Sequence, residues 1–455
     1  MILRTELRRS IAPWAGLAVL VVALGFLFLL SGPWWKAPAD WTSQTTTAAL
    51  WVRFLLVFLW PIVVGAGTIQ GIRDSRSGMT ELLATTSRPP WHRAAMLAAA
   101  VGGLSAFGYL LVFAAGMVEV VAHGGFVSAA FVPIVLVGVL AVVAGAWLGL
   151  AVGRLLPHPL TAPAAAVLSL VLMVLLWSAL DPETWTSSVI GSPRIGLLGP
   201  AIAQPHGTMV TTATAVDLGQ AVWFTGLALT AFLLLAATSA RGRLLGLLPV
   251  AVAVAVALPL LPSSADAGLS PDDSAARRVC DGPVCVAKLH EASLPLLASV
   301  GRDVLRQLEK IPGAPTRVDE STAAVGFALP EPRDPGAVLV DYQSEPQLLD
   351  ASGDELRRVL LAGAGTPSCL PRNAGELGDT AARTVSASWF TGELRPLPRG
   401  LGATVEPGGV IDTAWRAFRQ LPAAEQQRRI AALRQYYLRC PDGDPLAVLV
   451  PGLTR

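Results

Sequence analysis

The sequence predicts an all-α polytopic membrane bundle of six spans plus a seventh, followed by a mostly helical α+β soluble domain. Three observations lead to this fold class. Only 15% of the 455 residues are charged, the mean hydropathy is +0.55, and the charges are unevenly distributed. A soluble protein carries about 25% charged residues, so a wholly soluble chain is not expected. A disordered chain is excluded because 53% of the residues are hydrophobic.

The charge distribution places the boundary between the two parts near residue 262. Residues 1–262 contain 13 Lys/Arg and 8 Asp/Glu, whereas residues 263–455 contain 21 Lys/Arg and 24 Asp/Glu. The first part therefore has the low charge density of a membrane protein, and the second has that of a soluble domain. The total of +2 is close to neutral, so no nucleic-acid partner is expected.

Seven stretches are long and apolar enough to cross a bilayer, whose hydrocarbon core of roughly 30 Å requires about 20 helical residues. The first is expected to be a retained span and not a cleaved signal peptide, because its apolar stretch exceeds the usual length of about 7–15 residues and no Ala-x-Ala site follows it. The last is short and contains Pro249 and Pro259. The expected spans are residues 12–31, 50–69, 94–117, 127–152, 161–180, 218–239 and 244–261.

Basic residues in alternate loops predict the orientation. Ten Lys/Arg lie on the side of the N-terminus, and two, Lys36 and Arg194, lie on the other. The positive-inside rule then makes the N-terminus cytoplasmic. Seven spans would place residues 263–455 outside the cell, and six spans would place them inside. We expect a multi-pass protein of the cell membrane, embedded in the lipid bilayer, with an extracytoplasmic C-terminal domain.

All four cysteines lie in the second part, which is typical of two disulfides in an oxidising space. Three pairings are possible, and the sequence favours Cys280–Cys285 as a tight loop with Cys369–Cys440 as the long-range link. Four reduced thiols in a cytosolic domain are the alternative. A zinc site is not expected, because the C-x4-C motif has no second close pair and His290 is the domain's one histidine.

The cytoplasmic connection at residues 71–93 carries the functional signal. A short helix is expected to begin at Ser77 or Gly78 and to end before Pro89, since proline cannot continue a helix. Its apolar face would consist of Met79, Leu82 and Leu83. Such a face must rest on the membrane or insert into a partner. A simple interfacial turn is the alternative.

The run Arg-Ser-Gly-Met-Thr-Glu-Leu-Leu-Ala-Thr-Thr in this loop resembles the coupling-helix region of exporter-type ABC permeases. In that family a charged residue, x, Gly, two residues, Glu-Leu-Leu, x, Thr or Ser, x and Pro follow the second span. The matching residues here are Arg76, Gly78, Glu81, Leu82 and Leu83.

The resemblance extends over residues 1–240. The resemblance implies that Met1–Ser10 would form the amphipathic elbow helix that precedes the family's first span. It also implies that residues 181–217 would form an outer segment between the fifth and sixth spans. The chain departs from the family in three respects. Its loop proline comes late, at Pro89, and both a seventh span and a further domain follow the six-span core.

The resemblance implies a membrane permease subunit that couples ATP hydrolysis to export of an unknown substrate. A separate cytoplasmic ABC ATPase would bind ATP, and a second permease copy or paralogue would complete the transporter. No G-x-x-x-x-G-K-[ST] motif occurs in this chain, so ATP is expected to be bound by the partner subunit and no cofactor is expected here. The implied ATPase-coupling loop consists of Arg73, Asp74, Arg76, Gly78, Met79, Glu81, Leu82, Leu83 and Arg88.

The domain boundaries follow from these patterns. Residues 1–240 form the six-span domain, 241–262 the seventh span, 263–276 a polar linker, and 277–455 the disulfide-containing domain. In that last domain, strands are expected at 323–329 and 337–342, and helices at 289–310, 352–362, 376–391, 409–420 and 423–439.

No catalytic or metal-ligating set is apparent. His290-Glu291 begins like H-E-x-x-H, but residue 294 is leucine. Arg53 is expected to reach towards the membrane interface and not to contact a substrate. The chain is therefore not expected to be an enzyme. The alternative to a permease is a membrane-anchored sensor or assembly protein whose C-terminal domain binds a partner or ligand; a membrane-embedded enzyme is the third hypothesis.

Overall fold

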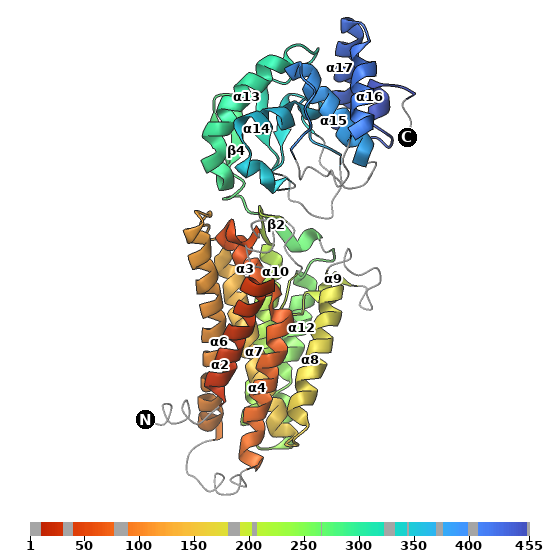
Figure 1. Cartoon of the computed structure of the whole chain (residues 1–455). Helices are drawn as coiled ribbons and strands as arrows, with labels where there is room; N and C mark the ends of the chain where they lie inside the picture. Colours follow the sequence, from red (N-terminus) through yellow and green to blue (C-terminus); the bar gives the residue numbers. More distant parts are fainter. Residues whose placement is uncertain are drawn as a thin grey trace. The chain divides into compact units, whose positions relative to one another are not determined.

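The chain folds into two compact units, Met1–Asp272 and Asp273–Arg455, which we call the membrane unit and the C-terminal unit. The membrane unit is a bundle of long helices, and the C-terminal unit is a smaller α+β region (Figure 1). The computed structural model describes residues 11–30, 40–76, 90–180, 192–202, 207–264, 266–322, 333–343, 345–369, 376–398 and 408–452.

Seven helices among the described residues are long and apolar enough to cross a membrane. This confirms the predicted helical bundle and indicates a membrane-embedded protein. The helices are α2 (Ala12–Gly25, extended by a π-turn at Phe26–Leu30), α4 (Leu56–Arg76), α6 (Pro90–Ala122), α7 (Phe131–Leu155), α8 (Thr161–Ser178), α10 (Thr214–Ala236) and the consecutive pair α11 (Ala240–Leu245) and α12 (Leu248–Leu260).

The predicted start of the second span, at residue 50, is wrong. A separate helix, α3 (Thr45–Phe54), precedes α4, and the two meet at Leu55. Pro61 lies inside α4. Because proline has no N–H to donate to the carbonyl four residues earlier, the first turn of α4 lacks a hydrogen bond at Val57.

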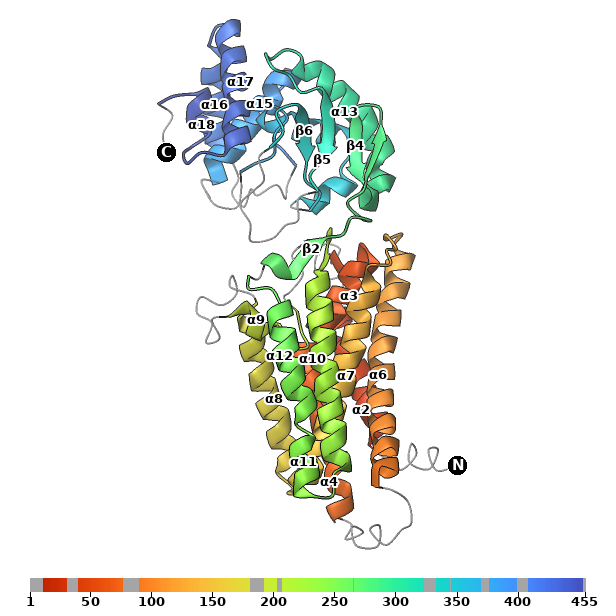
Figure 2. The ribbon, with the colours of Figure 1, turned by 180° about the vertical axis from the view of Figure 1, so that it is seen from behind.

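Helix α7 packs against α4, α6 and α10 at the centre of the bundle (Figures 1 and 2). Glycines make the α4–α7 contact unusually close. A Cβ added to Gly149 or Gly153 of α7 would overlap the backbone of α4, and one added to Gly67 of α4 would overlap the backbone of α7. The two backbones therefore touch directly, as in small-residue interfaces of membrane helices.

Smaller elements gather at one end of the bundle. Figures 1 and 2 place α3, α9 (Pro193–Gly196) and β2 (Leu269–Pro271) at this end, and α11 with the last turn of α4 at the other. Strand β1 (Val210–Thr212) pairs with β2 in antiparallel register.

The C-terminal unit contains a sheet in the order β3-β4-β5-β6. The first two strands form an antiparallel hairpin that turns at Gly282, whose φ of 61° favours glycine. The other contacts are parallel, and α13 (Leu294–Leu308) connects β4 to β5. The strands are β3 (Arg278–Asp281), β4 (Val284–Ala287), β5 (Arg317–Glu320) and β6 (Ala337–Val340).

Two predictions in this region need correction. The predicted helix 289–310 begins only at Leu294, because Lys288–Ser293 form a 3-10 turn in which His290 has non-helical dihedral angles. The predicted strand 337–342 ends at Val340. The predicted strand 323–329 lies outside the described residues.

Five helices complete the C-terminal unit, and the four predicted beyond residue 350 are confirmed to within one residue at each end. Helix α15 is buried on all sides from Ala381 to Ser388. A capping box between Ser352 and Glu355 fixes the start of α14. The helices are α14 (Gly353–Leu361), α15 (Glu376–Thr391), α16 (Gly408–Arg419), α17 (Ala423–Arg439) and the short α18 (Leu446–Leu449).

Candidate functional site

The predicted ATPase-coupling loop is described only at its start. Helix α4 continues through its last turn, which includes the backbone of Arg73, Asp74 and Arg76. Helix α6 resumes the described chain at Pro90. The remaining predicted residues, Gly78, Met79, Glu81, Leu82, Leu83 and Arg88, lie outside the described residues.

Arg53 does not reach the membrane interface, so that prediction is wrong. Its side chain is fully buried. The guanidinium donates from Nε to the Pro200 carbonyl oxygen (2.6 Å), from Nη1 to that of Ile134 (3.1 Å) and from Nη2 to Gln220 Oε1 (2.7 Å). Arginine suits this position because its planar group donates in several fixed directions. The residue thus links α3, α7 and α10 to the segment that follows α9.

Each backbone carbonyl oxygen from Leu197 to Pro200 accepts a hydrogen bond from a buried or partly buried side chain of the bundle. Gln220 Nε2 donates to the carbonyl oxygens of Leu197 (2.8 Å) and Gly199 (3.1 Å), and Trp223 Nε1 donates to that of Leu198 (2.8 Å). Irregular backbone in an apolar bundle must find such partners, because unpaired carbonyls are costly there. We call this set of contacts the carbonyl clasp. The one sequence signal was the spacing of two polar-tipped residues, Gln220 and Trp223, on one helix.

The C-terminal unit contains both disulfides that the sequence favours. Cys280 and Cys285 join directly opposite positions of β3 and β4, and Cys369 is bonded to Cys440 across 71 positions of sequence. The described residues contain no free cysteine. The long-range bond joins the end of α17 to the segment after α14.

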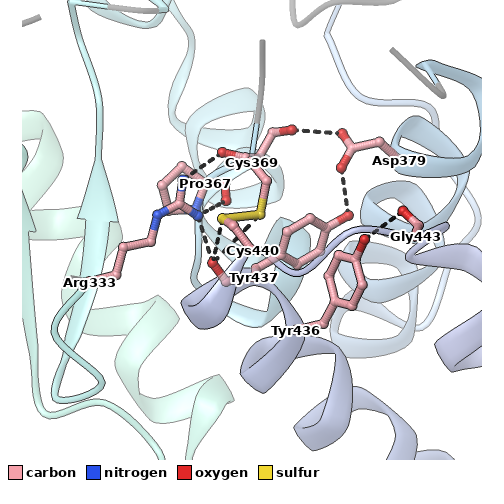
Figure 3. Close-up of a disulfide and its surroundings, with 9 residues drawn as sticks. Arg333, Pro367, Cys369, Asp379, Tyr436, Tyr437, Cys440 and Gly443 are labelled. Atoms are coloured by element: carbon pink, nitrogen blue, oxygen red, sulfur yellow. Dashed lines mark hydrogen bonds between the residues drawn. A yellow bond between two sulfur atoms is a disulfide. The ribbon is translucent and has the colours of Figure 1, made fainter. Parts of the chain in front are cut away.

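A buried polar network surrounds the long-range disulfide (Figure 3). Arg333 donates to the carbonyl oxygens of Pro367, Ser368 and Tyr437. The Tyr437 hydroxyl donates to Asp379 Oδ1 at 2.8 Å. Burial raises the pKa of Tyr437 well above its usual value, so the phenol stays protonated and remains a donor.

Arg434, like Arg333, donates hydrogen bonds to several backbone carbonyl oxygens inside the C-terminal unit. It is 1% exposed and donates to the carbonyl oxygens of Ala364, Pro335 and Ala337 at 2.7 to 3.0 Å. Burial lowers the pKa of Arg434 to about 10, so it is still charged near neutral pH. These contacts cover the outer edge of β6 and attach it to α17.

His290 and Glu320 meet at the carboxyl ends of the parallel strands, where ligands of open α/β sheets commonly bind. His290 Nδ1 lies 2.6 Å from Glu320 Oε1, and the Ala287 N–H donates to Glu320 Oε2 at 2.8 Å. Because a carboxylate only accepts, Nδ1 carries the proton. His290 is the one histidine of this part of the chain, and its partner is Glu320, not the adjacent Glu291. The described residues contain no cluster of ligands able to hold a metal ion.

Comparison of the chain with models of protein families, with curated proteins and with solved structures found no match.

Proposed function

We propose that the chain is the membrane permease subunit of an ABC transporter that exports an unknown substrate. Helices α2 to α10 would form the six-span permease core, with α11–α12 as an added seventh span. A partner ATPase would bind ATP and contact the loop between α4 and α6. The observation that carries the proposal is the Arg76-x-Gly-x-x-Glu-Leu-Leu pattern, which begins where α4 ends.

The packing of α4 supports this proposal mechanically. Gly67 and Gly71 of α4 meet the backbone of α7 directly, and Gly149 and Gly153 of α7 meet that of α4. A contact without intervening side chains transmits displacement with little loss, because packed interiors resist compression. A force applied to the loop after Arg76 would therefore reach the centre of the bundle.

The proposed orientation places the loop and the N-terminus in the cytoplasm and the C-terminal unit outside the cell. Helix α11, whose sequence includes Arg241 and Arg243, lies at the same end of the bundle as the last turn of α4 (Figure 2). Basic residues collected at one end are typical of the cytoplasmic side. A cysteine replacing Arg306 of α13, whose side chain is 73% exposed, should react with an impermeant maleimide on intact cells. One replacing the exposed Arg241 should react only after permeabilisation; the reverse result would exclude this orientation.

Affinity capture of the tagged chain from its native membrane tests the partner. We expect an ATPase to co-purify with the wild type and with a control variant, Leu156→Asp/Leu160→Asp, which places acids at exposed leucines of another predicted cytoplasmic loop. The variant Leu82→Asp/Leu83→Asp should lose the ATPase. Capture of no ATPase, or its retention by the latter variant, would contradict the permease proposal. Full function after scrambling of residues 76–88 would favour the anchored sensor or assembly protein instead.

A further inference from the structure

Arg383 and Arg434 are the two arginines that lie buried in the described part of the C-terminal unit, and they differ in their hydrogen bonds. Arg434 donates to the carbonyl oxygens of Ala364, Pro335 and Ala337. Arg383 lies in the middle of α15, is 2% exposed and donates no hydrogen bond to any residue that the structure describes. Burying a cation without acceptors is costly. Arg383 therefore lacks the partners that its position requires.

Arg383 forms an ion pair with Glu345, which lies between β6 and a 3-10 turn at Pro346–Asp350. Its Nη1 atom is 3.6 Å from Glu345 Oε1, which is longer than a hydrogen bond. Its Nε atom has no partner among the described residues. The Glu345 carboxylate accepts no hydrogen bond from these residues either, although its side chain is only 16% exposed. Both charged groups therefore retain unused hydrogen-bonding capacity.

The groups around this ion pair are mainly acidic. Asp379 lies one turn before Arg383 on α15 and already accepts hydrogen bonds from two hydroxyl groups, at 3.0 and 2.8 Å (Figure 3). Burial raises the pKa of Glu345, the charge of Arg383 opposes this shift, and Asp341 and Asp379 add to it. A ligand with only negative charge would be repelled by these acids. A ligand with only positive charge would leave Arg383 without an acceptor.

We propose that Arg383 and Glu345 bind a free α-amino acid. The carboxylate of the ligand accepts hydrogen bonds from Nε and Nη2 of Arg383, because a planar guanidinium matches a carboxylate with two parallel N–H groups. The ammonium group of the ligand donates to Glu345. Such a zwitterion adds no net charge to the acidic surroundings and supplies both missing partners.

The position of Glu345 in the fold suits a binding site. Its N–H donates to the carbonyl oxygen of Asp341, the residue directly after β6, at 3.0 Å. The site therefore lies near the carboxyl end of a parallel strand, where ligands of open α/β sheets commonly bind. The ligand enters from the side of Glu345, since that side chain is 16% exposed and the side chain of Arg383 is 3% exposed.

The inference goes beyond the proposed permease function, because the site lies within the C-terminal unit and needs neither an ATPase nor a transported substrate. Capture of the ATPase tests the loop between α4 and α6 alone. Binding of an amino acid and binding of an ATPase can therefore fail independently.

Isothermal titration calorimetry on the purified full chain in detergent tests the site, with each of the common α-amino acids as a probe. We expect at least one of them to bind with one molecule per chain. Its N-acetyl and carboxamide derivatives should bind about tenfold or more weakly, because each lacks one of the two charged groups. Binding of none of these amino acids would overturn the proposal, and so would equal binding of both derivatives.

Single substitutions locate the binding. Arg383→Lys keeps the charge but loses the planar guanidinium, and Glu345→Gln keeps the size but loses the charge. Each should weaken binding about tenfold or more. Arg306→Lys and Glu393→Gln make the same changes on side chains that are 73% and 64% exposed, and they should bind like the wild type. Unchanged binding by Arg383→Lys and Glu345→Gln would overturn the proposal.

A double variant separates ligand binding from a structural role. Arg383→Met/Glu345→Gln removes both buried charges, and replacing a buried ion pair by uncharged residues of similar volume is often neutral or stabilising. Without ligand, pulse proteolysis in urea should therefore give a midpoint no lower than that of the wild type. The bound amino acid should raise the midpoint of the wild type alone. A ligand-free double variant that is much less stable than the wild type would assign the pair a structural role and overturn the proposal.

Discussion

The guanidinium of Arg53 donates from Nε to the carbonyl oxygen of Pro200, 2.6 Å away and 147 positions later in the sequence. The described contacts of Arg53 are all with neutral acceptors and include no ion pair. A buried cation is tolerated only where several acceptors replace its water. The carbonyl clasp satisfies this requirement and at the same time fastens the irregular segment after α9 to the bundle.

Arg53→Gln should therefore destabilise the membrane unit. A glutamine is too short to reach all three acceptors, and each buried carbonyl left unpaired costs about 1–3 kcal/mol. Thermal unfolding in detergent, followed by tryptophan fluorescence, should show a lower Tm than for the wild type. Arg194→Gln is the matched control, because it removes the same charge from an exposed position of α9. Equal melting of the two variants would show that the clasp contributes no stability.

Long apolar runs and 3.6-residue periodicity were sufficient to predict the seven spans and the helices α14 to α17. The break at Leu55 was missed because α3 and α4 form one continuous helical pattern. The sheet was missed apart from β6, since four-residue strands such as Arg317–Glu320 are too short to show alternation. Sequence periodicity therefore predicts helices of nine or more residues here but not four-residue strands.

Side-chain partners were less predictable than elements. Arg53 was expected to reach towards the membrane interface, but it lies buried in α3. Its acceptors include backbone carbonyl oxygens, which every residue possesses, so no sequence motif marks them. The Glu320 partner of His290 likewise comes from a strand 30 positions away. The disulfide pairs were easier to predict, because four cysteines allow only three combinations.

Gly149→Ala should destabilise the bundle strongly. The added methyl group would overlap the Val64 carbonyl oxygen of α4, so the two helices would have to separate. Gly103→Ala in α6 is the matched control, because nothing lies within 4 Å of its added Cβ. The control should be neutral or stabilising by up to about 1 kcal/mol, the helix-propensity gain of alanine over glycine. Thermal unfolding of both variants checks the prediction, and a Gly149→Ala protein as stable as the control would contradict the close packing.

The two disulfides should differ in their contribution to stability. The chain-entropy relation gives about 4.4 kcal/mol for Cys369–Cys440, which closes 71 positions, and about 2.1 kcal/mol for Cys280–Cys285, which closes 5. Cys369→Ser/Cys440→Ser should therefore lower the free energy of unfolding of the C-terminal unit by about 2 kcal/mol more than Cys280→Ser/Cys285→Ser. Pulse proteolysis of the full chain in urea, detected with a C-terminal tag, measures both. The opposite ranking would disprove the loop-length explanation.

Tyr342 should make the C-terminal unit sensitive to alkaline pH. The residue is 2% exposed, and its ring packs against His290. Burial raises its pKa to about 12, and a hydrogen bond with Ser293 opposes part of this shift.

The free energy of unfolding should fall at alkaline pH, because the folded state holds the phenolic proton of Tyr342 more tightly than the unfolded state. The unfolded chain loses the phenolic proton near pH 10, its ordinary pKa, whereas the folded chain keeps the proton up to about pH 12. Between these values the folded state binds more protons, so the free energy of unfolding falls as pH rises. The fall attributable to Tyr342 should approach about 2–3 kcal/mol, at about 1.4 kcal/mol for each pKa unit. Tyr342→Phe lacks this contribution and should lose less stability between pH 9 and pH 12 in the same proteolysis assay. Parallel pH profiles for the two proteins would mean that Tyr342 ionises equally in both states and is accessible to solvent in the folded chain.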